Sequence, residues 1–251
     1  MFALITNDDG IGAPGIKVLE EAARQVFEEV LVVAPKGQAS AISHAITLNR
    51  SFRLFRQDES HVALEAYPAD CVFFALRELC HKQPDVVLSG INMGPNLGYD
   101  TLYSGTVAGA REGAMSGIAS LAFSLAGMPP DFPFDMTIPH VIRILQLVKR
   151  FGLPPETLLN VNLPAPEIFG DPKGFRFCHL GRRVFDNATA VFKDPMGGEH
   201  GWIGGRNFVM AGDEGSDCHA MKNGYITLSS LTWNMSSAPL PEVDSWERAL
   251  N

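Results

Sequence analysis

The sequence lacks the features that mark secreted, membrane-spanning and thiol-redox proteins. It contains no apolar run of 18 residues and no charged leader before its first apolar segment, so we expect neither a membrane span nor a signal peptide. Its cysteines show no CxxC spacing, and we expect all of them to be reduced: Cys71, Cys80, Cys178 and Cys218. The expected location of such a chain is the cytoplasm.

Positive charge is also scarce. The chain has 20 Lys and Arg against 28 Asp and Glu, a formal net charge of -8. This balance argues against a protein that coats a nucleic-acid polymer or binds an anionic membrane. Any phosphate compound that binds here must be attracted locally, by a metal ion or by backbone N–H groups.

The chain does contain alternating strand and helix patterns. Short apolar runs typical of buried strands alternate with segments whose apolar residues recur at helical spacing. We expect strands at 2–6, 30–34, 62–66, 86–88, 121–125 and 159–164, and helices at 15–29, 70–80, 107–114 and 138–148. This order predicts an α/β fold with a doubly wound, mostly parallel sheet, in which ligands bind beyond the carboxyl ends of the strands.

The first strand ends in two adjacent acids, Asp8 and Asp9. Neighbouring carboxylates on a strand tip repel one another, and burying even part of that charge is unfavourable without a counter-charge. A divalent cation is the simplest counter-charge. The alternative is an ordinary turn between strand and helix, because Asn, Asp and Gly are all turn formers.

The segment Gly10–Gly15 also fits the pattern G-x-G-x-x-G, which is found where a Rossmann fold binds a dinucleotide. Two features oppose this interpretation. Asp8 and Asp9 would repel a pyrophosphate, and the second strand ends at Val33–Lys36 without the acid that normally binds a ribose hydroxyl. We therefore do not expect a nicotinamide site.

Two further strand ends are polar and rich in glycine. They carry Ser40 and Asn92, which with Asp8 and Asp9 form a set of hard oxygen ligands suited to Mg, Mn or Ca and unsuited to zinc. We predict one divalent metal, Mg or Mn, per subunit on these four residues. Taken singly, Ser40 is an ordinary loop serine and Asn92 an ordinary turn former.

An anion site is expected beside the metal. Asn96 offers a side-chain amide, and Ser104, Gly105 and Thr106 open a helix, where free N–H groups favour anions. A metal next to an anion cradle is what phosphoryl transfer requires, because its catalysis consists mainly of positioning and charge stabilisation. The ordinary interpretation of Ser104 is a helix N-cap.

The C-terminal third has a different character. Residues 175–231 alternate apolar and polar residues over short stretches with glycines between them, which suggests hairpins or arms outside the main sheet. We divide the chain into an α/β catalytic core, residues 1–170, and a hairpin and C-terminal arm for oligomerisation, residues 171–251. Such arms often exchange between subunits; the alternative is a hairpin folded back on its own domain.

Several motifs stand in a characteristic order along the chain. They are Asn7–Gly10 with Ala13–Gly15, Val33–Pro35 with Ser40, Ser89–Asn92 with Gly94, Asn96 and Gly98, Tyr103–Val107 with Glu112 and Gly113, and Asn160–Asn162 with Pro164. Together they resemble the SurE survival-protein family of nucleotidases, and a set of ordered motifs is far more specific than any one of them.

The resemblance implies a Rossmann-like core with a C-terminal β-hairpin arm exchanged between subunits, in a homodimer or homotetramer. It implies a divalent-metal phosphatase acting on nucleoside 5'- and 3'-monophosphates, with some members also trimming short polyphosphate. It assigns the metal to Asp8, Asp9, Ser40 and Asn92, and the phosphate to Asn96, Ser104, Gly105 and Thr106. In departures from the family pattern, Ala41 replaces a common Gly, and Ser229–Ser230 stand where Thr-Pro is frequent.

Three questions stay open at this stage. The nucleophile is either a water activated by Asp8 or Asp9, or one of these carboxylates itself. His44 is either a general acid or phosphate ligand, or a packed loop histidine. The rival to an enzyme is a metal-dependent nucleotide-sensing module with the same fold, which would bind its ligand without releasing phosphate.

Overall fold

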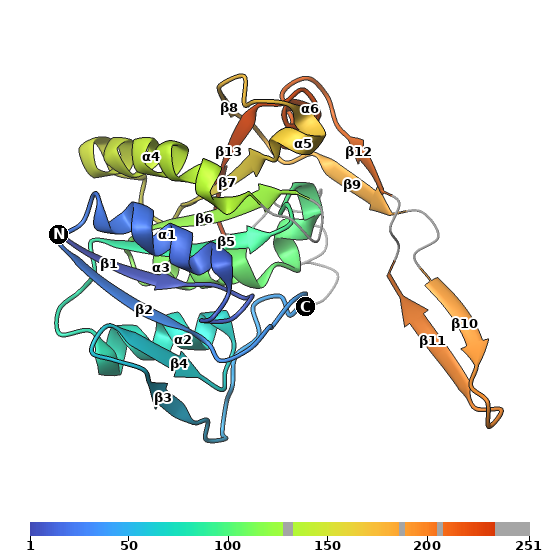
Figure 1. Cartoon of the computed structure of the whole chain (residues 1–251), viewed down its shortest axis with the longest axis horizontal. Helices are drawn as coiled ribbons and strands as arrows, with labels where there is room; N and C mark the ends of the chain where they lie inside the picture. The colour runs from blue at the N-terminus through green and yellow to red at the C-terminus, as the bar shows by residue number, and fades with distance from the viewer. Residues whose placement is uncertain (128–132, 186–188, 205–207, 234–251) are drawn as a thin grey trace, which may run out of the picture.

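The computed structural model describes residues 1–127, 133–185, 189–204 and 208–233 of the 251-residue chain. Its centre is a nine-stranded sheet flanked by helices on both faces, which confirms the predicted α/β class (Figure 1). The strand order is β3 (Leu54–Arg56), β4 (His61–Leu64), β2 (Glu29–Pro35), β1 (Phe2–Thr6), β5 (Val86–Met93), β6 (Ala119–Ala126), β7 (Leu158–Pro164), β13 (Ile226–Leu231) and β8 (Phe175–Phe177).

The middle of the sheet is parallel, from β4 through β2, β1, β5 and β6 to β7. Every residue of β1 and β7 is buried, as expected of strands covered on both faces. The order reverses at β1, which starts the chain and lies between β2 and β5. The carboxyl end of β1 is therefore at the switch point, where α/β sheets bind their ligands.

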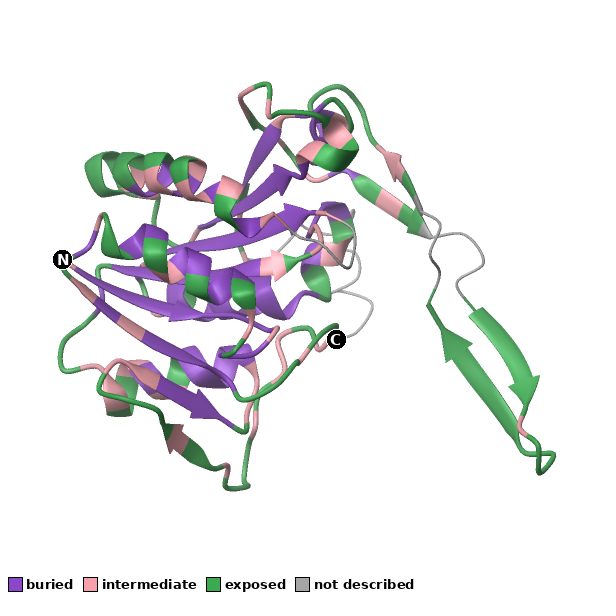
Figure 2. Cartoon of the chain, viewed as in Figure 1, coloured by how far each residue is buried: buried purple, intermediate pink, exposed green. Residues whose placement is uncertain are grey.

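Helices α1 (Pro14–Arg24) and α4 (Ile138–Phe151) share one apolar core with the sheet. On the other side, α2 (Pro68–Phe74), its continuation η1 (Ala75–Leu79) and α3 (Gly105–Met115) pack on the sheet through two smaller cores. Figure 2 shows the strands buried between these layers. Short helical segments are η2 (Gly98–Leu102), η3 (Phe134–Thr137), α5 (Pro166–Phe169) and α6 (Asp217–Lys222).

The interpretation of residues 175–231 as lying outside the main sheet is wrong at two strands. β13 pairs antiparallel with β7, and β8 pairs parallel with β13, so both extend the central sheet. The physical reason is burial: Ile226, Thr227 and Leu228 pack into the core, and a strand alternation alone does not specify its partner. The division of the chain at residue 170 stays a prediction.

The remaining strands of this region form an arm. β9 (Arg182–Phe185) pairs with β12 (Phe208–Ala211), and β10 (Thr189–Lys193) pairs with β11 (Glu199–Ile203), both antiparallel. The hairpin of β10 and β11 extends away from the core in Figure 1, and all ten of its strand residues are exposed. In the part of the chain that the structure describes, no helix is long and apolar enough to cross a membrane.

Helix α3 approaches the sheet closely because glycines lie along one of its faces. A side-chain carbon added at Gly109 would lie 2.7 Å from Cγ2 of Thr6 and 2.9 Å from Oγ of Ser89. At Gly105 the same carbon would lie 2.8 Å from Cβ of Asp8. The glycine face thus lets α3 pack close to the sheet, and it brings the N-terminus of the helix against Asp8.

We predict that Gly109→Ala destabilises the protein by about 1–3 kcal/mol, because the added methyl group forces β1, β5 and α3 apart and this outweighs the better helix propensity of Ala. The measurement is the free energy of unfolding in urea. Gly12→Ala is the matched control, since a carbon added at Gly12 meets nothing within 4 Å. Equal stability of the two variants would contradict the close packing of α3.

Candidate functional site

The carboxyl ends of β1, β2 and β5, with the loops that follow them and the turn before α3, line one cavity of about 640 Å³. The lining includes the four predicted metal ligands together with Asn96 and Ser104. The structure therefore brings together residues that lie up to 96 positions apart, from Asp8 to Ser104. Gly105 and Thr106 are buried behind the wall, next to Asp8.

Asp8 is buried and receives a hydrogen bond from the hydroxyl of Thr106. Burial raises the pKa of Asp8 from 3.8 to about 6; the Thr106 bond opposes this shift and the charge of Asp9 adds to it. No Lys or Arg of the described residues forms a salt bridge with Asp8 or Asp9. Among the residues that the structure describes, the pair is a concentrated negative charge that no Lys or Arg contacts as a salt bridge.

Asp9 and Asn92 lie at the carboxyl ends of the neighbouring strands β1 and β5 and line the same cavity. The backbone N–H of Met93 donates to Oδ2 of Asp9 at 3.0 Å, and Nδ2 of Asn92 donates to the carbonyl of Gly94 at 2.8 Å. Burial raises the pKa of Asp9, and the Met93 N–H opposes this. Because the amide nitrogen of Asn92 is engaged, its carboxamide oxygen is the group left to act as a ligand.

The loop after β2 carries Ser40, whose hydroxyl lies 3.1 Å from Nε2 of Gln38. The loop is fastened to β1 by the N–H of Ala39, which donates to the carbonyl of Asp8 at 2.7 Å. His44, farther along the loop, pairs with Glu112 of α3 at 3.0 Å and is not among the cavity-lining residues. This contact supports the interpretation of His44 as a packed loop histidine.

Asn96 is buried in a network of amides beneath the cavity. Its backbone N–H donates to Oδ1 of Asn162 at 2.7 Å, and its side-chain Nδ2 donates to Oγ of Ser124 at 2.8 Å. The side chains of Asn160 and Asn162 donate to its carbonyl. The side-chain amide of Asn96, predicted to bind phosphate, therefore donates to another protein group. Its effect on the site is to hold the Gly94–Asn96 loop in place.

Ser104 is the N-cap of α3, where its hydroxyl accepts the N–H of Val107 at 3.0 Å. The first N–H groups of an α-helix have no partner within the helix, so this end can receive an anion. The side chain of Thr106 is bonded to Asp8 and buried, so its hydroxyl orients a carboxylate. The Val107 N–H is taken by Ser104, and Ser104 itself is the residue at this end of α3 that lines the cavity.

The cavity also includes residues that sequence analysis did not name. Asp100 follows the Asn96 loop, and Arg183, Ile203 and Gly204 come from the arm. Burial raises the pKa of Asp100, and the neighbouring Arg183 guanidinium opposes the shift. No sequence signal links Asp100 to Arg183, because they lie 83 positions apart and their contact depends on how the arm folds.

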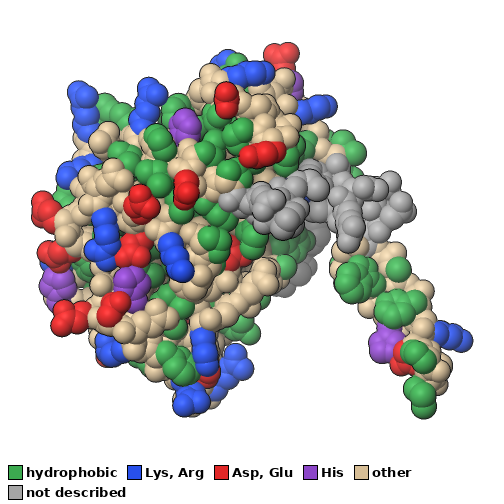
Figure 3. Space-filling view, viewed as in Figure 1, with side chains coloured by type: hydrophobic (Ala, Val, Ile, Leu, Met, Phe, Trp, Pro, Cys, Tyr) green, Lys and Arg blue, Asp and Glu red, His purple; other side chains and the backbone are tan. Residues whose placement is uncertain are grey.

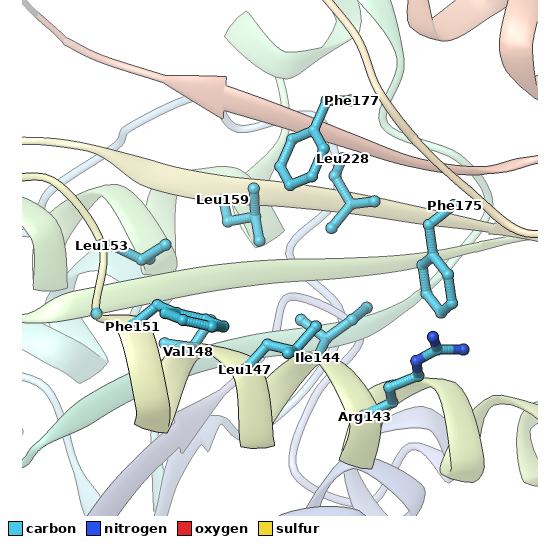
Figure 4. Close-up of a pocket in the computed structure, with 11 residues that line it drawn as sticks. Arg143, Ile144, Leu147, Val148, Phe151, Leu153, Leu159, Phe175, Phe177 and Leu228 are labelled. Carbon is cyan, nitrogen blue, oxygen red and sulfur yellow. The ribbon is translucent and has the colours of Figure 1, made fainter.

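A second cavity, of about 460 Å³, lies between α4 and the end of the sheet formed by β7, β13 and β8 (Figure 4). Apart from Arg143 and Gly152, its lining is apolar: Ile144, Leu147, Val148, Phe151, Leu153, Leu159, Phe175, Phe177 and Leu228. It offers no nucleophile, acid or metal ligand, and its apolar lining does not fit a phosphate compound.

The donor chemistry of this site fits a hard divalent cation. Among the described residues, no three His, Cys, Asp or Glu side chains gather into a metal site, so a cation here depends on the neutral oxygens of Ser40 and Asn92 beside the two carboxylates. A hard-oxygen set of this kind suits Mg or Mn. The uncompensated charge of Asp8 and Asp9 is what such a cation would neutralise.

A doubly wound sheet whose switch point gathers hard oxygen donors beside a helix N-terminus is typical of proteins that bind phosphate compounds. The chain belongs to the SurE family: the profile of the family described as "Survival protein SurE" matches residues 3–187. The resemblance to the SurE family that the ordered motifs indicated is confirmed.

Relatives of similar length support this membership. The chain is 44% identical over 235 residues to "5'-nucleotidase SurE" of Gemmatimonas aurantiaca, covering 92% of each chain. It is 42% identical over 252 residues to the protein of the same name from an Anaeromyxobacter species, covering 98% of this chain and 96% of that one. The crystal structure of the SurE protein from Aquifex aeolicus matches with a TM-score of 0.85 at 35% identity, over 100% of both chains.

We predict that Asp8→Asn stabilises the metal-free protein near neutral pH. The folded pKa of Asp8 lies above its ordinary value, so the folded protein binds more protons than the unfolded chain between pH 3.8 and about 6. The free energy of unfolding therefore falls as pH rises through this window. Removing the charge should add about 1–3 kcal/mol at neutral pH in EDTA, and little near pH 4.

The measurement is urea unfolding of both proteins at several pH values. Asp171→Asn is the matched control, because Asp171 is exposed and is not among the residues that line the cavity. A variant that is no more stable than the wild type at neutral pH would contradict the cost assigned to the buried carboxylate.

Proposed function

We propose that this chain is a divalent-metal-dependent phosphatase that hydrolyses nucleoside 5'- and 3'-monophosphates to nucleoside and phosphate. The class of enzyme, a phosphoric monoester hydrolase, agrees with the name 5'-nucleotidase carried by its relatives. The observation that supports the proposal most directly is the convergence of Asp8, Asp9, Ser40 and Asn92 on one cavity at the start of α3. We propose short polyphosphate as a further substrate class.

Asp8, Asp9, Ser40 and Asn92 would hold one Mg or Mn ion per subunit. When bound, the ion supplies positive charge that stabilises the developing negative charge on a phosphate oxygen. The chain itself contributes the N-terminal N–H groups of α3 and the loop held by Asn96, which bind and orient the remaining oxygens. Thr106 fixes the orientation of Asp8 through its hydroxyl.

Asp9 is the residue we assign to proton transfer from an attacking water. Oδ1 of Asp8 already receives the Thr106 hydroxyl, and Asp8 is the more deeply buried of the two acids.

The walls away from the acids suit a nucleoside. Met93, Tyr103 and Ile203 line the cavity and are all exposed, so their apolar surface is accessible to a base or ribose. The cavity volume of about 640 Å³ is within the range of small-molecule sites. Aromatic and apolar walls bind a base without specifying which base it is.

We further propose that the chain forms a homodimer or homotetramer through its arm, with exchange of the β10–β11 hairpin between subunits. The support is the hairpin of β10 and β11, which pairs only within itself among the described strands and exposes Val191, Phe192 and Trp202. Figure 3 shows apolar side chains gathered on this projecting hairpin. A hairpin of this kind gains stability when another surface covers it. The cytoplasmic location stays a prediction.

The central prediction is that phosphate release depends on a divalent metal ion and on the carboxylate of Asp9. The wild type should release phosphate from nucleoside monophosphates with Mg or Mn, and EDTA should abolish release. Asp9→Asn should lower kcat by at least about a hundredfold, because proton transfer and metal binding are both impaired. Asp171→Asn, the exposed control, should keep wild-type rates. Nucleotide binding without release under any metal would favour the sensing module and refute the enzyme.

The second prediction is that the oligomer depends on the apolar surface of the β10–β11 hairpin. Replacing both Val191 and Trp202 by Ser should lower the molecular mass measured by sedimentation, because it removes exposed apolar surface from the proposed contact. Leu48→Ser is the control, since Leu48 is a similarly exposed apolar residue outside the arm. A wild type that sediments as a monomer would refute the proposal.

A further inference from the structure

The charges that line the candidate active site are unbalanced. Three carboxylates face the cavity, those of Asp8, Asp9 and Asp100, and Arg183 is the one cation among its lining residues in the described part of the chain. The substrate class proposed above is itself anionic. Asp100 is not one of the predicted metal ligands, so a separate counter-charge is needed to keep its carboxylate from repelling a phosphate group.

Arg183 is placed to be this device. Its Nη1 bonds to Oδ2 of Asp100 and lies 3.4 Å from the carbonyl oxygen of Pro95. The two side chains are 10% and 20% exposed, so their charges are only partly screened by water. The pair therefore joins β9 of the arm to the loop that forms the cavity wall.

The same contact reaches the anion end of α3. The backbone carbonyl of Asp100 accepts the N–H groups of Tyr103 at 3.0 Å and Ser104 at 3.1 Å. Ser104 is the N-cap of α3, so the ion pair orients the turn that leads directly into the helix. Neutralising Arg183 would thus change both the charge beside the phosphate and the restraint on this turn.

The arm does not depend on Arg183 for its attachment. The carboxylate of Asp217 accepts the N–H of Gly98 at 2.8 Å and the N–H of Gly181 at 2.7 Å. Gly98 has a φ of +54°, and a side-chain carbon there would lie 2.6 Å from the carbonyl oxygen of Gly181. This junction holds the arm against the active-site loop two residues before Arg183, so a variant at Arg183 is expected to fold.

We infer that Arg183 is a positioning residue for phosphate-ester binding: it neutralises Asp100 and fixes the Pro95–Ser104 loop, so that the cavity accepts an anionic substrate. The inference rests on the proposed function for its substrate. It gives the arm a part in the chemistry of the core, separate from any role in oligomerisation.

The test uses adenosine 5'-monophosphate as the probe, with KM and kcat from phosphate release and Kd from calorimetry. Arg183→Gln should raise KM and Kd by about tenfold while kcat changes by less than about threefold, because repulsion from Asp100 acts on binding of the phosphate group. Arg182→Gln is the matched control: it removes the same charge from the neighbouring exposed position of β9 and should leave all three values unchanged.

A second variant also removes the carboxylate of Asp100. In the double variant Asp100→Asn with Arg183→Gln, KM and Kd should return to within about threefold of the wild type, since the uncompensated charge is gone. A double variant as weak as Arg183→Gln alone would overturn the inference, because Arg183 would then act by touching the substrate or by packing. An unchanged KM and Kd in Arg183→Gln would overturn it as well.

Failure of the proposed function is recognisable separately. If the wild type binds the nucleotide without releasing phosphate, the phosphatase proposal fails, and the Kd values of the same variants still decide the role of Arg183. If the wild type neither binds nor hydrolyses the probe, both proposals are overturned. Thermal unfolding of every variant excludes loss of fold as the cause of a weaker Kd.

Discussion

The candidate site is organised by the cost of holding two adjacent carboxylates at the buried tip of β1. Neither Asp8 nor Asp9 has a salt bridge to a Lys or Arg of the described residues, and burial raises the pKa of both. The surrounding elements limit this cost: Thr106 donates to Asp8, the N–H of Met93 donates to Asp9, and the glycine face of α3 brings a helix N-terminus against Asp8. The two buried carboxylates lower the stability of the metal-free fold, and they provide the negative charge that a cation would bind.

Beneath the acids, the protein supports its loops with neutral polar groups. The amides of Asn160 and Asn162 hold the carbonyl of Asn96, and Ser124 receives the Asn96 side chain. Buried networks of this kind fix one backbone arrangement because each group would be costly without its partners. The Gly94–Asn96 loop is therefore positioned before substrate arrives, which is what catalysis by preorganised charge requires.

The sequence was sufficient to predict the parallel sheet and to place Asp8, Asp9, Ser40 and Asn92 in one cavity, because buried strands and their polar ends are local patterns. The metal role of these residues stays a prediction. The start of a helix at Ser104 was predicted for the same reason, with the N-cap as the alternative to the phosphate role of this residue. The places of β8 and β13 were missed, since pairing partners are not encoded in alternation alone. Asp100 and Arg183 were missed because their contact depends on docking of the arm, and the use of Thr106 on Asp8 depends on the depth of α3.

The exposed hairpin also gives the molecule two levels of stability. β10 and β11 bond to each other and bury no strand residue in the core, whereas β1 and β7 are buried throughout. A two-stranded hairpin is marginal by itself in water, so its amide hydrogens can exchange with solvent while the central sheet stays closed. In an isolated subunit, hydrogen exchange in this hairpin therefore reports local opening, and global unfolding has to be followed in the strands of the sheet.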